Sequence, residues 1–158
     1  MKYRQMNLAQ AFTCRHCKMV VNTHPDLSGV KNRNHCPYCL HSRHLDLWQP
    51  GDRLSACKGL MLPVGLTIKA TNKRYPCQGE LMLVHRCTDC GAVSINRLAA
   101  DDLAEQVYRV YVRSWDMGVE HARLQQVNGI RVLDRSCQDE VRRQLFGNSE
   151  YVDGYYKC

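Results

Sequence analysis

The chain has 158 residues, ten of them cysteines, and a formal net charge of +7. This length allows one domain, or one domain with a small appendage. The start of the chain lacks the apolar run of a secretory signal, and the most apolar stretch, residues 59–68, is far shorter than the roughly 20 residues of a membrane span. We therefore expect a cytoplasmic protein with no membrane partner, in which reduced cysteine pairs hold metal.

The charge is unevenly distributed along the chain. Residues 1–100 carry a net charge of +9, whereas residues 101–158 carry −2. A basic block indicates an acidic partner, most often a nucleic acid. Two zinc centres of four thiolates each would lower the charge of the first block by about 4 in total, and the block would stay basic.

Two C-x-x-C pairs enclose the first motif, within residues 12–40. Cys14 and Cys17 form one pair, and Cys36 and Cys39 form the other. The segment between the pairs is rich in turn formers and has no helical periodicity. The spacing is typical of a tetrahedral zinc site with four thiolates. A rubredoxin-like iron site and a disulfide are the alternatives.

A second cysteine set follows in residues 57–90. It consists of Cys57, Cys77, Cys87 and Cys90, and we expect these four to hold a second zinc ion. An interleaved pairing, in which Cys57 and Cys77 join one of the earlier pairs, is the alternative. If Cys57 or Cys77 is only a buried thiol, a histidine takes its place, and His85 is the nearest in sequence. Either centre would have four protein ligands and would therefore be structural rather than catalytic.

The last cysteine pair lies in a predicted hairpin. Residues 79–87 read as a strand that enters the cysteine turn, and residues 91–96 as the returning strand. Gly91 supplies the positive φ that turns backbone N–H groups toward the sulfurs. This arrangement predicts a zinc knuckle on a hairpin.

The pattern becomes helical from about residue 98. Leu103, Val107, Val110 and Tyr111 share one helical face, although the β-branched residues leave a strand as the alternative. Asp101 and Asp102 are expected to cap this helix. Further helices are predicted over residues 116–127 and from about 134 to 146, the last with Cys137 packed in its core face.

These elements predict an α+β fold. Residues 12–100 would form a zinc-ribbon-like β module with two four-cysteine sites, and residues 101–158 a short helical extension. Zinc binding would supply folding energy that the small core of the module cannot provide.

Basic and aromatic residues surround the first cysteine motif. A rigid, metal-held turn that carries arginines and a ring is suited to grip RNA. The expected nucleic-acid contacts are Lys31, Arg33, Tyr38, Arg43, His44, Arg86 and Arg97. Alternatively, Arg33, Asn34 and His35 only support the metal centre, through hydrogen bonds to sulfur or to the backbone of the turn.

The pentapeptide Arg33-Asn34-His35-Cys36-Pro37 resembles the signature of the RNHCP family of small bacterial proteins. The stretches MLVHRCTDCG and INRLAADD are also similar to that family, so the resemblance covers roughly residues 12–102. It implies a metal-binding domain, and it carries over no catalytic residue. The rest of the chain lies beyond the resemblance.

Four functions fit these features. The first is a non-catalytic zinc protein that binds RNA, with ribosomal RNA as a target, and the second is an adaptor whose helices at 103–127 dock a protein partner. A third, a zinc hydrolase of nucleic acids, would need His41 or His44 with Asp46 beside an open zinc site. The fourth is a thiol redox sensor. No Gly-rich phosphate loop and no H-E-x-x-H motif supports an enzyme.

Overall fold

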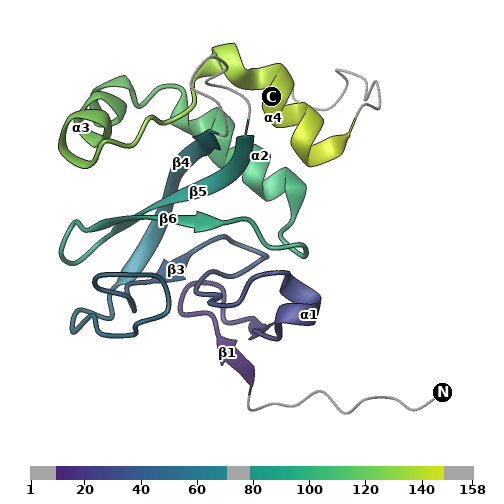
Figure 1. Ribbon diagram of the computed structural model, residues 1–158, viewed down its shortest axis with the longest axis vertical. Coiled ribbons are helices and arrows are strands. Elements are labelled where there is room, and N and C mark those ends of the chain that lie inside the picture. The colour runs from purple at the N-terminus through teal and green to yellow at the C-terminus, as the bar shows by residue number, and fades with distance from the viewer. Residues whose placement is uncertain (1–9, 71–78, 148–158) are drawn as a thin grey trace.

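The computed structural model describes residues 10–70 and 79–147. A short ribbon and a single helical turn come first, followed by a four-stranded antiparallel sheet and then by helices (Figure 1). The ribbon and turn are β1 (Ala11–Thr13), β2 (Val20–Asn22) and α1 (Pro25–Ser28). The sheet runs in the order β3 (Ser42–Arg43), β4 (Leu60–Ala70), β5 (Gly79–Cys87) and β6 (Val93–Arg97). The helical elements are α2 (Ala104–Ser114), α3 (Gly118–Asn128), the 3-10 turn η2 (Arg135–Cys137) and α4 (Gln138–Phe146).

The sheet is centred on β5, which pairs with β4 on one side and β6 on the other. The expected hairpin at residues 79–96 is confirmed. The long strand β4 was not expected, because Pro63 and Gly65 interrupt its sequence. Its register shifts between these two residues, so a bulge accommodates the proline that cannot donate to the ladder. Gly65 allows a close approach, since a Cβ there would lie 2.6 Å from Val132 Cγ1.

Helices cover both faces of the sheet. Neighbouring residues of a strand point to opposite faces. Leu83 therefore joins the larger core, which α2 and α4 complete, and Val84 joins the smaller core, which α3 completes through Leu124. The predicted α+β class is confirmed. The boundary predicted at residue 100 falls within this packed unit, because the helices and the sheet share a core.

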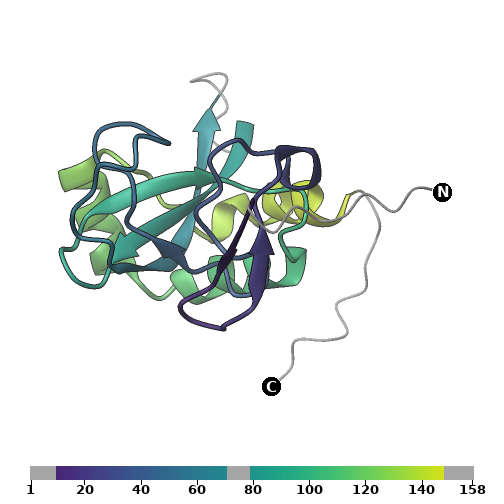
Figure 2. The same cartoon turned by 90° about the horizontal axis from the view of Figure 1, so that it is seen from below.

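The cysteine-rich N-terminal segment lies at one end of the sheet (Figures 1 and 2). Strand β3 links it to β4, and Leu40, fully buried, enters the larger core. Its own core is small and consists of Cys14, Val21 and Cys36 with three half-buried neighbours. In the described part of the chain, no helix is long and apolar enough to cross a membrane.

Candidate metal centres

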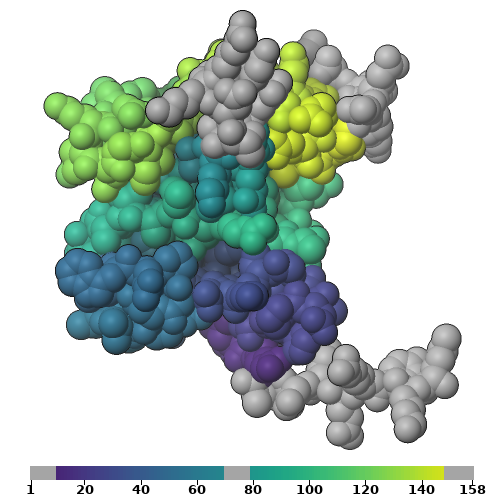
Figure 3. All heavy atoms as spheres, viewed as in Figure 1, coloured from purple at the N-terminus to yellow at the C-terminus, as the bar shows by residue number. Residues whose placement is uncertain are grey.

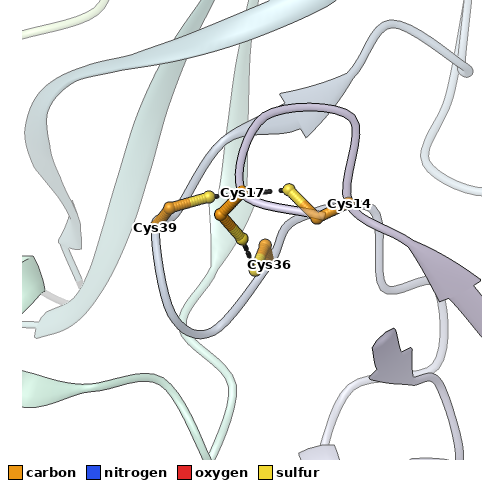
Figure 4. A group of neighbouring side chains, drawn as sticks. All are labelled: Cys14, Cys17, Cys36 and Cys39. Atoms are coloured by element: carbon orange, nitrogen blue, oxygen red, sulfur yellow. Dashed lines mark hydrogen bonds between the residues drawn. The ribbon is translucent and has the colours of Figure 1, made fainter. Parts of the chain in front are cut away.

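The first centre brings together the four predicted cysteines (Figure 4). Cys14 Sγ lies 3.6 Å from Cys39 Sγ, and Cys17 Sγ lies 3.5 Å from Cys36 Sγ. A zinc ion with bonds of about 2.3 Å to each sulfur spaces neighbouring sulfurs by about 3.8 Å, so the spacing fits a tetrahedral site. All four thiols are free, and the chemistry of the donor set fits zinc.

The backbone of each C-x-x-C turn follows the same pattern. The residue after the second cysteine has a positive φ, and its N–H donates a hydrogen bond to the carbonyl of the first cysteine. These residues are Lys18, Leu40 and Gly91, with φ of 65°, 61° and 75°. Their N–H groups donate to Cys14, Cys36 and Cys87 at 3.0, 2.8 and 3.1 Å. The expected role of Gly91 is confirmed, and two non-glycine residues accept the same strained conformation.

The thiols of the first centre differ in acidity. Burial raises the pKa of Cys36 to about 11, and the neighbouring Cys17 and Cys14 add to the rise. Burial also acts on Cys17, but hydrogen bonds from the Met19 N–H and from Cys36 outweigh it and lower the pKa. Four thiolates side by side repel one another in this site. A divalent cation removes that penalty, because it binds the sulfurs as thiolates and the thiol protons are released to solvent.

In the second centre, the described residues place a histidine beside three of the predicted cysteines. Three of the predicted cysteines, Cys57, Cys87 and Cys90, lie together with His44. Cys57 Sγ is 3.6 Å from Cys87 Sγ, and Cys90 Sγ is 3.2 Å from His44 Nδ1. Three sulfurs and one imidazole form a common zinc site. The fourth predicted ligand, Cys77, lies outside the described residues.

His85 does not complete the second centre. It is a fully buried residue of β5, where its Nε2 donates to the Leu40 carbonyl at 2.7 Å and its Nδ1 accepts from Asn96 at 2.9 Å. Burial lowers the pKa of His85 to about 3. Both ring nitrogens are engaged, so this histidine stays neutral and ties the first cysteine motif to the sheet.

Substitutions at His44 and Cys77 will show which residue is the fourth ligand. We expect His44→Ala to weaken the second metal by at least about tenfold, since a ligand lost from a closed site leaves three donors. We expect Cys77→Ser to leave both metals bound. Metal content after dialysis against a graded chelator measures each effect. The opposite ranking would make Cys77 the ligand.

A third cluster, formed by His16, Cys39 and His41, does not form a metal site. The two imidazoles stack with centroids 3.6 Å apart and planes 6° from parallel. A metal must lie close to the plane of each imidazole that binds it. Stacked parallel rings cannot both meet this condition.

The signature residues Arg33 and His35 bind carboxylates far along the chain. Arg33 Nη1 donates to both Asp101 oxygens at 2.6 and 2.8 Å, and Nη2 donates to Asp102 at 3.2 Å. His35 Nε2 lies 2.8 Å from Asp102. The Arg33 side chain has no exposed surface, so its expected contact with nucleic acid is wrong. The expected capping by the two aspartates is also wrong, because α2 begins at Ala104 after an N-cap at Leu103.

The remaining expected contact residues are scattered. Lys31 and Tyr38 are exposed, and His44 belongs to the second centre. Arg43 is half-buried. Arg86 pairs with Glu120 at 2.7 Å and Arg97 with Glu80 at 2.5 Å, on two different elements. The structure thus does not bring the seven residues into one surface.

A different set of cations is contiguous. Lys18 Nζ donates to the Arg15 carbonyl at 2.7 Å, Arg15 Nη1 to the Lys58 carbonyl at 3.1 Å, and Lys58 Nζ to the Arg53 carbonyl at 3.3 Å. We call these four residues the basic strip. It links the turns of the two centres. Three of its members directly follow cysteine ligands in the sequence, and that position was the signal available beforehand.

Comparison with known proteins gives one match. Residues 9–108 match a family model described as the RNHCP domain. No curated protein and no solved structure matches the chain.

Proposed function

The chain belongs to the RNHCP domain family, and on that premise we propose that it is a cytosolic, non-catalytic protein whose two structural zinc ions present a basic surface to RNA, ribosomal RNA included. The basic strip carries this proposal. Within the described residues, no carboxylate forms an ion pair with Lys18, Arg15 or Lys58. Their charges remain available for phosphate groups.

The geometry of the centres supports a structural role for the metals. Each centre offers four protein donors, which leaves no position for water or substrate. A hydrolase would need an open position beside His41 or His44. His44 is itself a donor of the second centre, and His41 stacks on His16. These arrangements favour binding over catalysis.

Salt-dependent RNA binding tests the proposal. Affinity for a single-stranded oligonucleotide, measured by fluorescence anisotropy, is expected to fall steeply with salt, with a slope of about −0.7 per phosphate contacted. The double variant Arg15→Gln with Lys58→Gln should lower the affinity and flatten the slope by about 1.4.

Arg86→Gln with Arg97→Gln is the matched control, because it removes the same charge from outside the strip. It should leave the slope unchanged. Equal effects of the two double variants would mean that the basic strip contributes to binding only through the net charge of the protein. Absence of RNA binding by the unmodified protein at about 50 mM salt would contradict the proposal.

An adaptor role is the second candidate. Val119 and Val127 on α3 are 90% and 70% exposed. Exposed apolar side chains on one helix are a feature of protein interaction sites. Capture of one protein that is insensitive to salt, and that is lost in Val119→Glu, would favour the adaptor.

A further inference from the structure

The loop of residues 44–58 carries an unusual side chain at its tip. Trp48 is 82% exposed, and Leu47 and Leu54 beside it are also exposed. The loop lies at one corner of the molecule, next to the N-terminal module that contains the first centre (Figure 3). A tryptophan this exposed loses the benefit of burial, so its position calls for a reason.

One carboxylate fixes the loop around this tryptophan. Asp52 accepts hydrogen bonds from the N–H groups of Leu47, Trp48, Gln49 and Leu54, at 2.8 to 3.0 Å. These bonds, that to Leu54 first, hold the pKa of the Asp52 carboxyl well below its usual range. The carboxylate therefore stays ionised, and the loop keeps its shape in mild acid.

Asn34 of the Arg33–Pro37 signature also holds this loop in place. Asn34 Nδ2 donates to Asp46 Oδ2 at 2.9 Å, and Arg53 Nη1 donates to the Asn34 side-chain oxygen. The Arg53 N–H donates to Asp46 Oδ1 at 3.1 Å. Gly51 has a φ of +91°, and a Cβ there would lie 2.6 Å from the Asn32 side chain. The exposed ring thus stands on a backbone that is ordered before any ligand arrives.

The charge around the loop indicates what the ring meets. Arg53 belongs both to this loop and to the basic strip, which runs from there along Lys58, Arg15 and Lys18. A row of cations that leads away from an aromatic ring matches a single strand, in which phosphates alternate with bases. Insertion into a bilayer is disfavoured, because Asp52 is ionised at the centre of the apolar tip.

We propose that Trp48 is a stacking site for one unpaired nucleobase of a single-stranded RNA whose adjoining phosphates follow the basic strip. This inference rests on the proposed function and adds the site at which a base is held. An exposed, pre-ordered ring stacks on any base without loss of loop entropy. The site therefore selects single strands over duplexes, whose bases are already stacked.

Titration of the full-length zinc-loaded protein with a labelled single-stranded RNA of about twelve nucleotides tests this site. Trp48→Ala is expected to weaken binding by about tenfold or more, whereas Trp48→Phe should retain most of it. Asp52→Ala, which keeps the ring but releases the loop, should give an intermediate loss. Val119→Ala, which removes an equally exposed apolar side chain on α3, should have no effect.

Fluorescence reports the stacking directly. In a Trp115→Phe background Trp48 is the single tryptophan, and RNA should quench it while a duplex of the same sequence should not. RNA binding that is salt-dependent but unaffected by Trp48→Ala would overturn the stacking site and leave the proposed function standing. Absence of RNA binding by the unmodified protein, or a blue shift of Trp48 on anionic phosphatidylglycerol vesicles without RNA binding, would overturn both.

Discussion

Replacing Cys36 with serine is expected to lower the metal content from two ions per chain to one and to unfold the N-terminal module. Cys36 is fully buried, and with Cys14 and Val21 it forms the small core of the module. So small a core cannot stabilise residues 11–41 without the metal. Structural zinc contributes about 10–16 kcal/mol in isolated zinc-finger peptides, so the effect should exceed that of an ordinary core substitution.

Elemental analysis and amide hydrogen exchange measure this outcome. Residues 11–41 should lose protection, and the loss should extend to the larger core, because Leu40 packs there and its carbonyl accepts from His85. Cys90→Ser is the matched control. Cys90 is exposed, at the rim of the second centre, so its loss should leave the first module protected. A Cys36→Ser protein that keeps two ions, or full protection without metal, would contradict a structural role.

Local patterns in the sequence predicted local structure correctly. The C-x-x-C spacing fixed the first quartet, since two turns of that kind can place four sulfurs around one ion. The hairpin followed from its strand pattern, α2 from its helical periodicity, and the ends of α3 and α4 from Gly129 and Gly147. In each case the signal and the structure that it specifies lie within a few residues of one another.

Long-range partners could not be read in the same way. The carboxylates that bind Arg33 and His35 lie 68 and 67 residues further along, and nothing near either partner marks the pairing. His44 looked like one more basic residue of a crowded segment. Its place as a ligand depends on β3 and β4 pairing, which brings His44 beside Gly59 through a hydrogen bond of 2.9 Å. Strand β4 was not predicted from the sequence, because Pro63 and Gly65 are unfavourable inside a strand.

The signature pentapeptide thereby acquires a physical meaning. Cys36 is a ligand, Arg33 and His35 bind the segment that leads into α2, and Asn34 holds the loop that carries Trp48. Three structural units thus meet at four adjacent residues. The basic block of the sequence led us to expect a nucleic-acid surface around the first motif, but the buried Arg33 of that block stabilises the fold instead.

Replacing Asp102 with alanine is expected to destabilise the fold by about 3 kcal/mol, because His35 and the Ala99 N–H lose their buried acceptor and Arg33 keeps only the partly exposed Asp101. The Asp102 side chain is 2% exposed and accepts from Arg33, from His35 and from the Ala99 N–H at 2.7 Å. Asp101→Ala should cost only about 1 kcal/mol, because that carboxylate is 42% exposed and Arg33 keeps Asp102.

Urea unfolding of the zinc-loaded protein gives both values, and a double-mutant cycle separates the pair from its surroundings. Arg33→Ala combined with Asp102→Ala should cost less than the sum of the two single variants, because both single variants already remove the hydrogen bond between these two side chains. Strict additivity would mean that the two side chains act independently, and the link from the first metal centre to α2 would have to lie elsewhere. A coupling of about 2 kcal/mol or more would place it at this ion pair.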